Sequence, residues 1–142
     1  MEVSDVRRRL LQTIDRARRA AAERRGRADA AAQSYEAVLE NVATPVFRMF
    51  VTALRAEGHP FAVHTPAGGL RLASDRSAED YIELALDTTI DPPAAIARVS
   101  RSRGHRVIST EREIREKTAI ERLTEEDVLE FLLGEIVPFV VR

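Results

Sequence analysis

The first forty residues carry a helical pattern of apolar positions. Residues 3–42 contain no proline and are rich in alanine, arginine, glutamate and leucine, which favour helix. Apolar or aromatic residues recur in alternating steps of four and three, which is typical of a coiled-coil seam. The seam comprises Leu10, Ile14, Ala17, Ala21, Ala28, Ala31, Tyr35, Val38 and Val42, and Arg24 alone interrupts it. The pattern predicts an N-terminal helical, coiled-coil-like arm over residues 1–43.

The length of this arm leaves three arrangements open. Forty helical residues would span about 60 Å, whereas a compact domain of 142 residues is less than about 40 Å across. The helix therefore either breaks near Gly26 into a hairpin or projects from the body. A projecting seam implies a second copy or a partner helix, because apolar residues in water are unfavourable. In the third arrangement, the stripe packs on the chain's own sheet.

Residues 44–58 predict a separate helix docked on the body. Thr44 and Pro45 resemble a cap followed by proline at the first helical position. Gly58 is expected to end the helix in the left-handed conformation. The alternative is that Pro45 kinks one continuous helix. The apolar residues that share one face at helical spacing are Val46, Phe47, Phe50 and Leu54.

The middle of the chain predicts an antiparallel sheet. Residues 61–64 and 70–74 alternate around the turn-forming residues 65–69, as in a hairpin. Residues 81–89 alternate most regularly, although their capping-like start also allows a short helix. Residues 95–101 and 106–110 predict a second hairpin. Short links between neighbouring strands favour a meander.

A final helix is predicted to begin at Thr124, because residues 124–127 resemble a capping box. Its apolar face is wide, and the chain continues into an apolar tail with Phe139 and Val140. The tail either packs into the body or forms half of an interface. We therefore predict an α+β fold: an antiparallel meander of four to five strands packed by two helices in residues 44–142, with the long helical arm before it.

Composition narrows the classes further. Apolar residues make up 44% of the chain and charged residues 32%, as in soluble globular proteins. The lack of cysteine excludes a disulfide framework and a thiol nucleophile, and suits a reducing cytoplasm. We expect no signal peptide and no membrane span, since residues 1–7 lack an apolar core and no run of about 18 apolar residues occurs. The bias to arginine and alanine is typical of GC-rich bacterial coding.

The net charge of −1 divides unevenly along the chain. Residues 1–29 hold nine arginines against five acids, a net charge of +4, and the remainder carries −5. Such asymmetry can mark an interaction arm. The alternative is a solvated helix whose arginine side chains cover apolar surface.

A second basic cluster surrounds a predicted turn at Gly104. It comprises Arg98, Arg101, Arg103, His105 and Arg106. Guanidinium groups at a hairpin tip suit phosphate, so this cluster is the candidate for anion or nucleic-acid contact. No aromatic residue lies between them for base stacking. A solvated hairpin whose charges prevent edge-to-edge aggregation is the alternative.

The sequence carries no recognisable catalytic, metal or cofactor motif. The three histidines lack metal-ligand spacing, and no phosphate loop, nucleophile elbow or dinucleotide fingerprint occurs. We therefore expect a non-enzymatic interaction or adaptor protein without cofactor, which forms a homodimer through the arm and the apolar tail. The alternatives are a nucleic-acid-associated protein and a small-ligand-binding or enzymatic domain with a pocket between sheet and helices.

Overall fold

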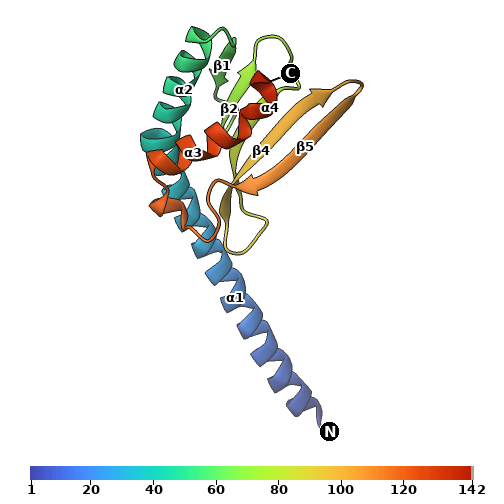
Figure 1. Ribbon diagram of the computed structural model, residues 1–142. Helices are drawn as coiled ribbons and strands as arrows, with labels where there is room; N and C mark the ends of the chain where they lie inside the picture. Colours follow the sequence, from blue (N-terminus) through green and yellow to red (C-terminus); the bar gives the residue numbers. More distant parts are fainter. Residues whose placement is uncertain (142) are drawn as a thin grey trace.

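The computed structural model describes residues 1–141 (Figure 1). A long helix leads into a five-stranded sheet, and short helices close the chain. The helices are α1 (Val3–Val38), α2 (Thr44–Ala56), α3 (Glu125–Glu135) and α4 (Val137–Val140), with a π-helical turn at Leu39–Ala43 and a 3₁₀ turn at Ile120–Arg122. The strands are β1 (Phe61–His64), β2 (Gly69–Ser74), β3 (Tyr81–Asp87), β4 (Ala94–Arg103) and β5 (Arg106–Glu113).

The sheet is an antiparallel meander in the order β1-β2-β3-β4-β5. Every strand pairs with the next along the chain, as short links between alternating segments favour. Residues 81–87 form a strand, which decides between the strand and helix interpretations of that segment. The predicted α+β fold with a helical arm is confirmed.

The helix does not end before Pro45. Residues Val3 to Ala56 form one helix of 54 residues, so the predicted separate helix starting at Thr44 is wrong. Pro45 has no N–H to donate to the preceding turn, and the wider π-helical turn absorbs that loss. The N–H of Thr44 bonds the carbonyl of Leu39, five residues earlier. Pro45 therefore lies inside a continuous helix.

Gly58 ends this helix as predicted. Its φ of +85° is the left-handed conformation that glycine adopts without steric cost. The N–H of His59 bonds the carbonyl of Leu54 at 2.8 Å, and the N–H of Gly58 bonds that of Arg55 at 3.1 Å. These two bonds form a Schellman motif, which turns the chain into β1.

One face of the sheet is apolar and is covered by helices. The side chains that line it alternate along the strands and are nearly or completely buried: Phe61, Leu70, Leu72, Ile82, Leu84, Ala95, Ala97 and Val99. From α2 and α3 they meet the fully buried Phe47, Val128 and Leu132. Thr124 and Asp127 form the predicted capping box, which sets the start of α3.

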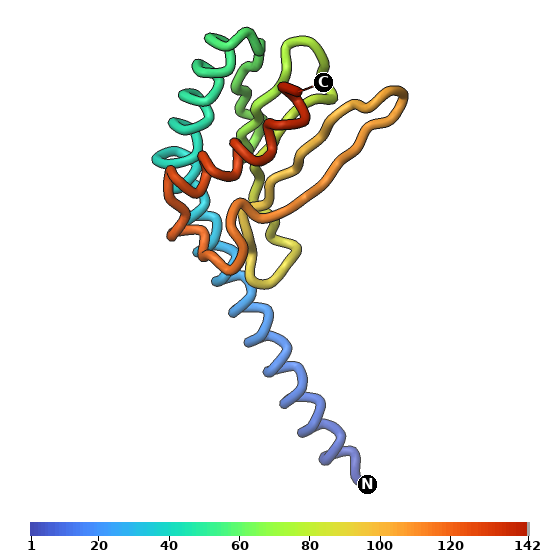
Figure 2. The backbone as a smooth tube through the Cα atoms, in the orientation of Figure 1, coloured from blue at the N-terminus to red at the C-terminus, as the bar shows by residue number. Residues whose placement is uncertain are grey.

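The N-terminal part of α1 projects from this body (Figure 2). Gly26 lies inside α1 with open space around it, so the helix does not fold back as a hairpin there. Residues Val3–Gly26 extend for about 36 Å at 1.5 Å per residue. The C-terminal part of the predicted arm belongs to the body instead, because Tyr35, Val38 and Ala43 are core residues.

Candidate functional site

The projecting part of α1 exposes the first half of the seam. Leu10 has 55% of its surface accessible, and Ile14 is half-buried only by its own helical neighbours. Ala17 is exposed, and Ala21 is partly exposed. Nothing among the described residues covers this stripe (Figure 1).

Three further apolar residues, on or beside the continuation of the seam, enlarge this exposed stripe, and the seam predicted from the sequence did not include them. Leu11 is 55% exposed, Val6 50% and Val3 84%. Val6 and Leu11 occupy positions that flank the coiled-coil seam, where a residue touches the edge of a partner helix, whereas Val3 lies on the seam itself, one heptad before Leu10. Apolar residues at flanking positions were the signal for Val6 and Leu11, and the heptad spacing extended toward the N-terminus was the signal for Val3.

The second half of the seam packs on the chain's own body. Tyr35 and Val38 are buried, and Ala31 and Val42 pack against the core. Ala28 is partly buried. The same face of one helix is thus exposed in its N-terminal half and packed on the core in its C-terminal half. These residues already contact other parts of the same chain, so the candidate interface is limited to the segment before Ala28.

Tyr35 anchors the helix to the sheet. Its hydroxyl lies 3.2 Å from the carbonyl oxygen of Gly68 and 3.3 Å from that of Leu84, and these two acceptors share its single proton. Burial raises the pKa of Tyr35 to about 12, and the nearby carboxylate of Glu83 contributes in the same direction. The buried environment therefore favours the neutral, protonated form of the Tyr35 side chain.

The charged pairs of the projecting helix lie away from the seam. Arg8 binds Asp5 at 3.1 Å, and Arg19 binds Asp15 at 2.8 Å. At 100° per residue, both pairs fall on the side of α1 opposite Leu10. The arm therefore has a charged face and an apolar face, as a helix that packs on one side requires.

The apolar tail contributes to the core rather than to an open surface. Phe139 is 8% exposed, and its ring meets that of Phe61 edge to face at 6.0 Å. Val140 is partly buried against the same cluster. Of the two arrangements predicted for the tail, the structure therefore has the one in which the tail packs into the body. Phe139 is not available to a partner. Val137 and Val141 stay exposed beside it.

The structure divides the basic hairpin between two faces. The turn contains only Gly104, with φ of +63°, and His105, because Arg103 and Arg106 are paired across the strands. Arg101, Arg103 and Arg106 fall on one face by the register of β4 and β5. Arg98 lies on the other face and is bound by Glu111.

Arg98 belongs to a charged ladder across the open face of the sheet. Arg71 binds Glu83 at 3.0 Å and lies 4.3 Å from the centre of the Tyr81 ring. Glu83 and Arg98 are cross-strand neighbours on β3 and β4. The pKa of Arg98 is raised, chiefly by its hydrogen bond to Glu111. These contacts account for Arg98 as a structural residue of the open face.

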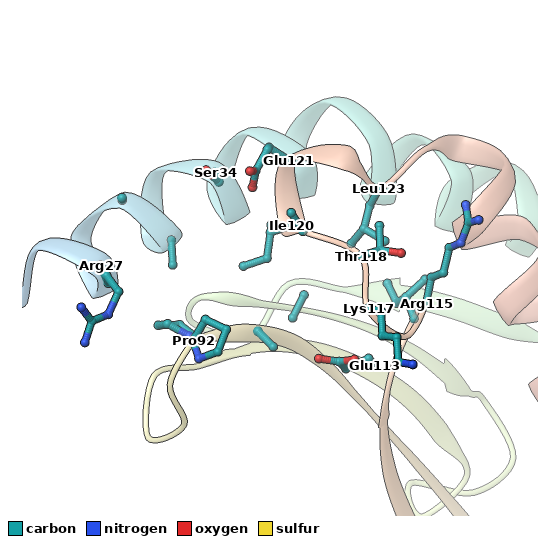
Figure 3. Close-up of a pocket in the computed structure, with 17 residues that line it drawn as sticks. Arg27, Ser34, Pro92, Glu113, Arg115, Lys117, Thr118, Ile120, Glu121 and Leu123 are labelled. Carbon is teal, nitrogen blue, oxygen red and sulfur yellow. The ribbon is translucent and has the colours of Figure 1, made fainter. Parts of the chain in front are cut away.

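A cleft of about 700 Å³ lies where α1, the β3–β4 loop and the segment before α3 meet (Figure 3). Ala31, Pro92 and Ile120 are among its apolar walls. Arg27 at one end binds Asp91, and Arg115 at the other binds Asp127. Its arginines are thus already paired. Among residues 1–141, no group of three or more histidines and acids could hold a metal ion.

The helix from Val3 to Ala56 also meets the length and composition criteria for a membrane span. It contains an apolar window of 18 residues, of which a third is buried. Core helices of soluble proteins meet the same criteria, and the most apolar part of this helix carries the core residues Val46, Phe47 and Phe50.

Comparison with protein-family models, with curated proteins and with solved structures finds no match, so the function is inferred from the chain's own residues and geometry.

Proposed function

We propose that this chain is a non-enzymatic interaction protein that forms a homodimer through the projecting part of its N-terminal helix. The observation that carries the proposal is the apolar stripe around Leu10 and Ile14, which stands outside the body without cover. Full burial of one large aliphatic side chain stabilises an association by roughly 1.5–3 kcal/mol. Several such residues per copy would be covered together in a dimer.

The length of the projecting helix supports a partner as well. A helix that makes no tertiary contacts gains stability only from its own hydrogen bonds and propensities, and its apolar face is normally what stabilises it in a protein. The arm ends its contacts with the body near Arg27, about 36 Å from its first turn. A second helix on the seam supplies packing contacts for the part of the arm that the body does not cover. A cysteine-free dimer of this kind suits a reducing cytoplasm.

A substitution in the stripe tests this function directly. Leu10→Glu combined with Ile14→Glu keeps helix-forming residues but places two charges on the stripe. The matched control, Gln12→Glu with Gly26→Glu, adds the same charge on the opposite face, where a Cβ at residue 26 meets open space. Sedimentation equilibrium is expected to give about twice the 15.9 kDa chain mass for the wild type and the control, and one chain mass for the seam variant. A monomeric wild type would refute the function.

The hairpin tip supports a second function, contact with nucleic acid. The observation that favours it is the placement of Arg101, Arg103 and Arg106 on one face of a projecting turn. Their forked donors suit phosphate oxygens. The test is binding to generic double-stranded DNA and to single-stranded RNA. Affinity is expected to fall steeply as salt rises and to be lost in Arg103→Glu with Arg106→Glu; lack of binding at low salt would remove this function.

A further inference from the structure

We propose that the arms of two copies pair antiparallel over residues Val3–Ala21, so that the two bodies lie at opposite ends of a rod. The inference rests on the proposed self-association and adds its geometry. It follows from three features of one copy: which part of the seam its own body covers, where arginines interrupt the seam, and where the apolar side chains are largest.

The body of each copy blocks a parallel pair. The helix runs without a break from Val3 to Val38, and the seam beyond Arg27 faces the chain's own sheet and loops. In a parallel, in-register pair, residues 28–38 of the partner would lie against the same residues of the first copy. The core around Tyr35 and Val38 already occupies that side of the helix. An antiparallel pair avoids this overlap, because each helix leaves the other before the body begins.

The arginines on the seam select the register. Arg24 interrupts the seam, and the same heptad spacing continued before Leu10 reaches Arg7 and Val3. A parallel pair in register would place Arg24 against the partner's Arg24. An antiparallel pair that overlaps as far as Ala28 would place Arg7 against the partner's Arg24 twice. Like charges at a buried seam are strongly unfavourable.

Sliding the antiparallel pair by one heptad removes both conflicts. Arg7 then lies against the partner's Ala17, where its long side chain can extend to water over a small residue. Arg24 falls outside the paired segment. The partner's Val3 is level with Ala21, six residues or about 9 Å before Arg27 contacts the body. The paired segment therefore fits between the end of the arm and the body.

The same register brings the largest apolar residues together at the centre. Leu10 lies against the partner's Ile14, and Ile14 against the partner's Leu10. The flanking Leu11 meets its own counterpart across the two-fold axis, which explains why a leucine stands 55% exposed beside the seam. Val3 packs on the partner's Ala21. A large residue against a small one is the complementarity that lets helices approach closely.

Distances between single labels distinguish the arrangements, and the cysteine-free chain allows each label to be unique. Gln12→Cys and Gly26→Cys carry spin labels for pulsed electron resonance on the full chain. Both positions lie on the side opposite the seam, and a Cβ at residue 26 meets open space. In the proposed pair, the two Gln12 labels lie at the same height along the helix axis, and the distance between them is about 20 Å across the two packed helices. The Gly26 labels are about 42 Å apart along the axis, since 28 residues separate their levels.

Each alternative gives another pair of distances. Two short distances of about 20 Å in a dimer would show a parallel pair and overturn the inference while leaving self-association intact. The longer antiparallel overlap would bring the Gly26 labels to about 32 Å along the axis and separate the Gln12 labels by about 10 Å, which also overturns it. No intermolecular distance at either site would remove the self-association as well. Leu10→Glu with Ile14→Glu in each labelled chain is expected to abolish both distances.

Discussion

Arg27 and Asp91 join the helix to the body at the point where the arm becomes free. Arg27 Nε lies 3.1 Å from Asp91 Oδ1, and Arg27 Nη2 lies 2.9 Å from Asp91 Oδ2, a two-point ion pair between α1 and the β3–β4 loop. Toward Val38 the seam packs on the sheet, and toward Val3 it is open. The pair therefore marks the boundary between the structural and the candidate functional half of one helix face.

This ion pair is expected to contribute little to stability. The two side chains are 46% and 55% exposed, so water screens their attraction. Arg27→Ala should lower the free energy of unfolding by less than about 1 kcal/mol, and a double-mutant cycle with Asp91→Ala should give a coupling of about 0.5 kcal/mol. Urea unfolding measures both. A coupling above about 2 kcal/mol would contradict this account of a solvated pair.

The packing of α2 on the sheet should dominate stability. Phe47 is 1% exposed in the core, so Phe47→Ala should cost about 3–5 kcal/mol. Met49, two residues along the same helix, is 58% exposed, and Met49→Ala should change stability by less than about 0.5 kcal/mol. Denaturant unfolding of the two variants measures the difference. Equal losses would mean that α2 does not face the sheet as described.

The buried hydroxyl of Tyr35 predicts a stability change in alkali. Its pKa is raised from 10.0 to about 12, so the stabilisation is complete below pH 10 and is lost as the pH rises through about 12. The chain has two tyrosines and no tryptophan, so in Tyr81→Phe the tyrosinate absorbance reports Tyr35 alone. The transition should lie near pH 12. A transition near pH 10 in the folded protein would show that the phenol is solvated.

The capping box of α3 predicts a stability change in acid. The pKa of Asp127 is lowered from 3.8, chiefly by the hydrogen bond from the Thr124 backbone N–H. Its contribution is therefore present above pH 3.8 and is lost as the pH falls through the lowered pKa.

Two variants measure this cap. Thr124→Ala should cost about 1 kcal/mol near neutral pH. The stability difference between the wild type and Asp127→Asn should shrink as the pH falls below 3.8. Thermal unfolding of both proteins over a range of pH measures this difference. A difference that does not depend on pH would show that the Asp127 carboxylate does not stabilise the capping box.

Local chemistry explains which parts of the fold could be predicted from the sequence. Alternation specified β3, Gly58 specified the end of α2, and Thr124 specified the start of α3, because each depends on residues within one turn or strand. Pro45 gave the wrong helix boundary, because the outcome depended on whether a π-helical turn could absorb the missing N–H.

The candidate interface could be predicted only in part. The heptad spacing identified Leu10 and Ile14, but the same spacing also included Tyr35 and Val38, which are buried in the core. Periodicity specifies a helix face without specifying what covers it. The division of that face at Arg27 needed the position of the β3–β4 loop, which lies 64 residues away in the sequence.

The oligomeric state of the full chain tests the central claim most directly. Sedimentation velocity over a range of concentrations should show an elongated dimer of about twice the 15.9 kDa chain mass. Leu10→Glu with Ile14→Glu should convert it to a monomer whose body stays folded, while Gln12→Glu with Gly26→Glu should leave it dimeric. A wild-type chain that stays monomeric at all concentrations, or a seam variant that dimerises as well as the control, would contradict the claim that the exposed seam is the interface.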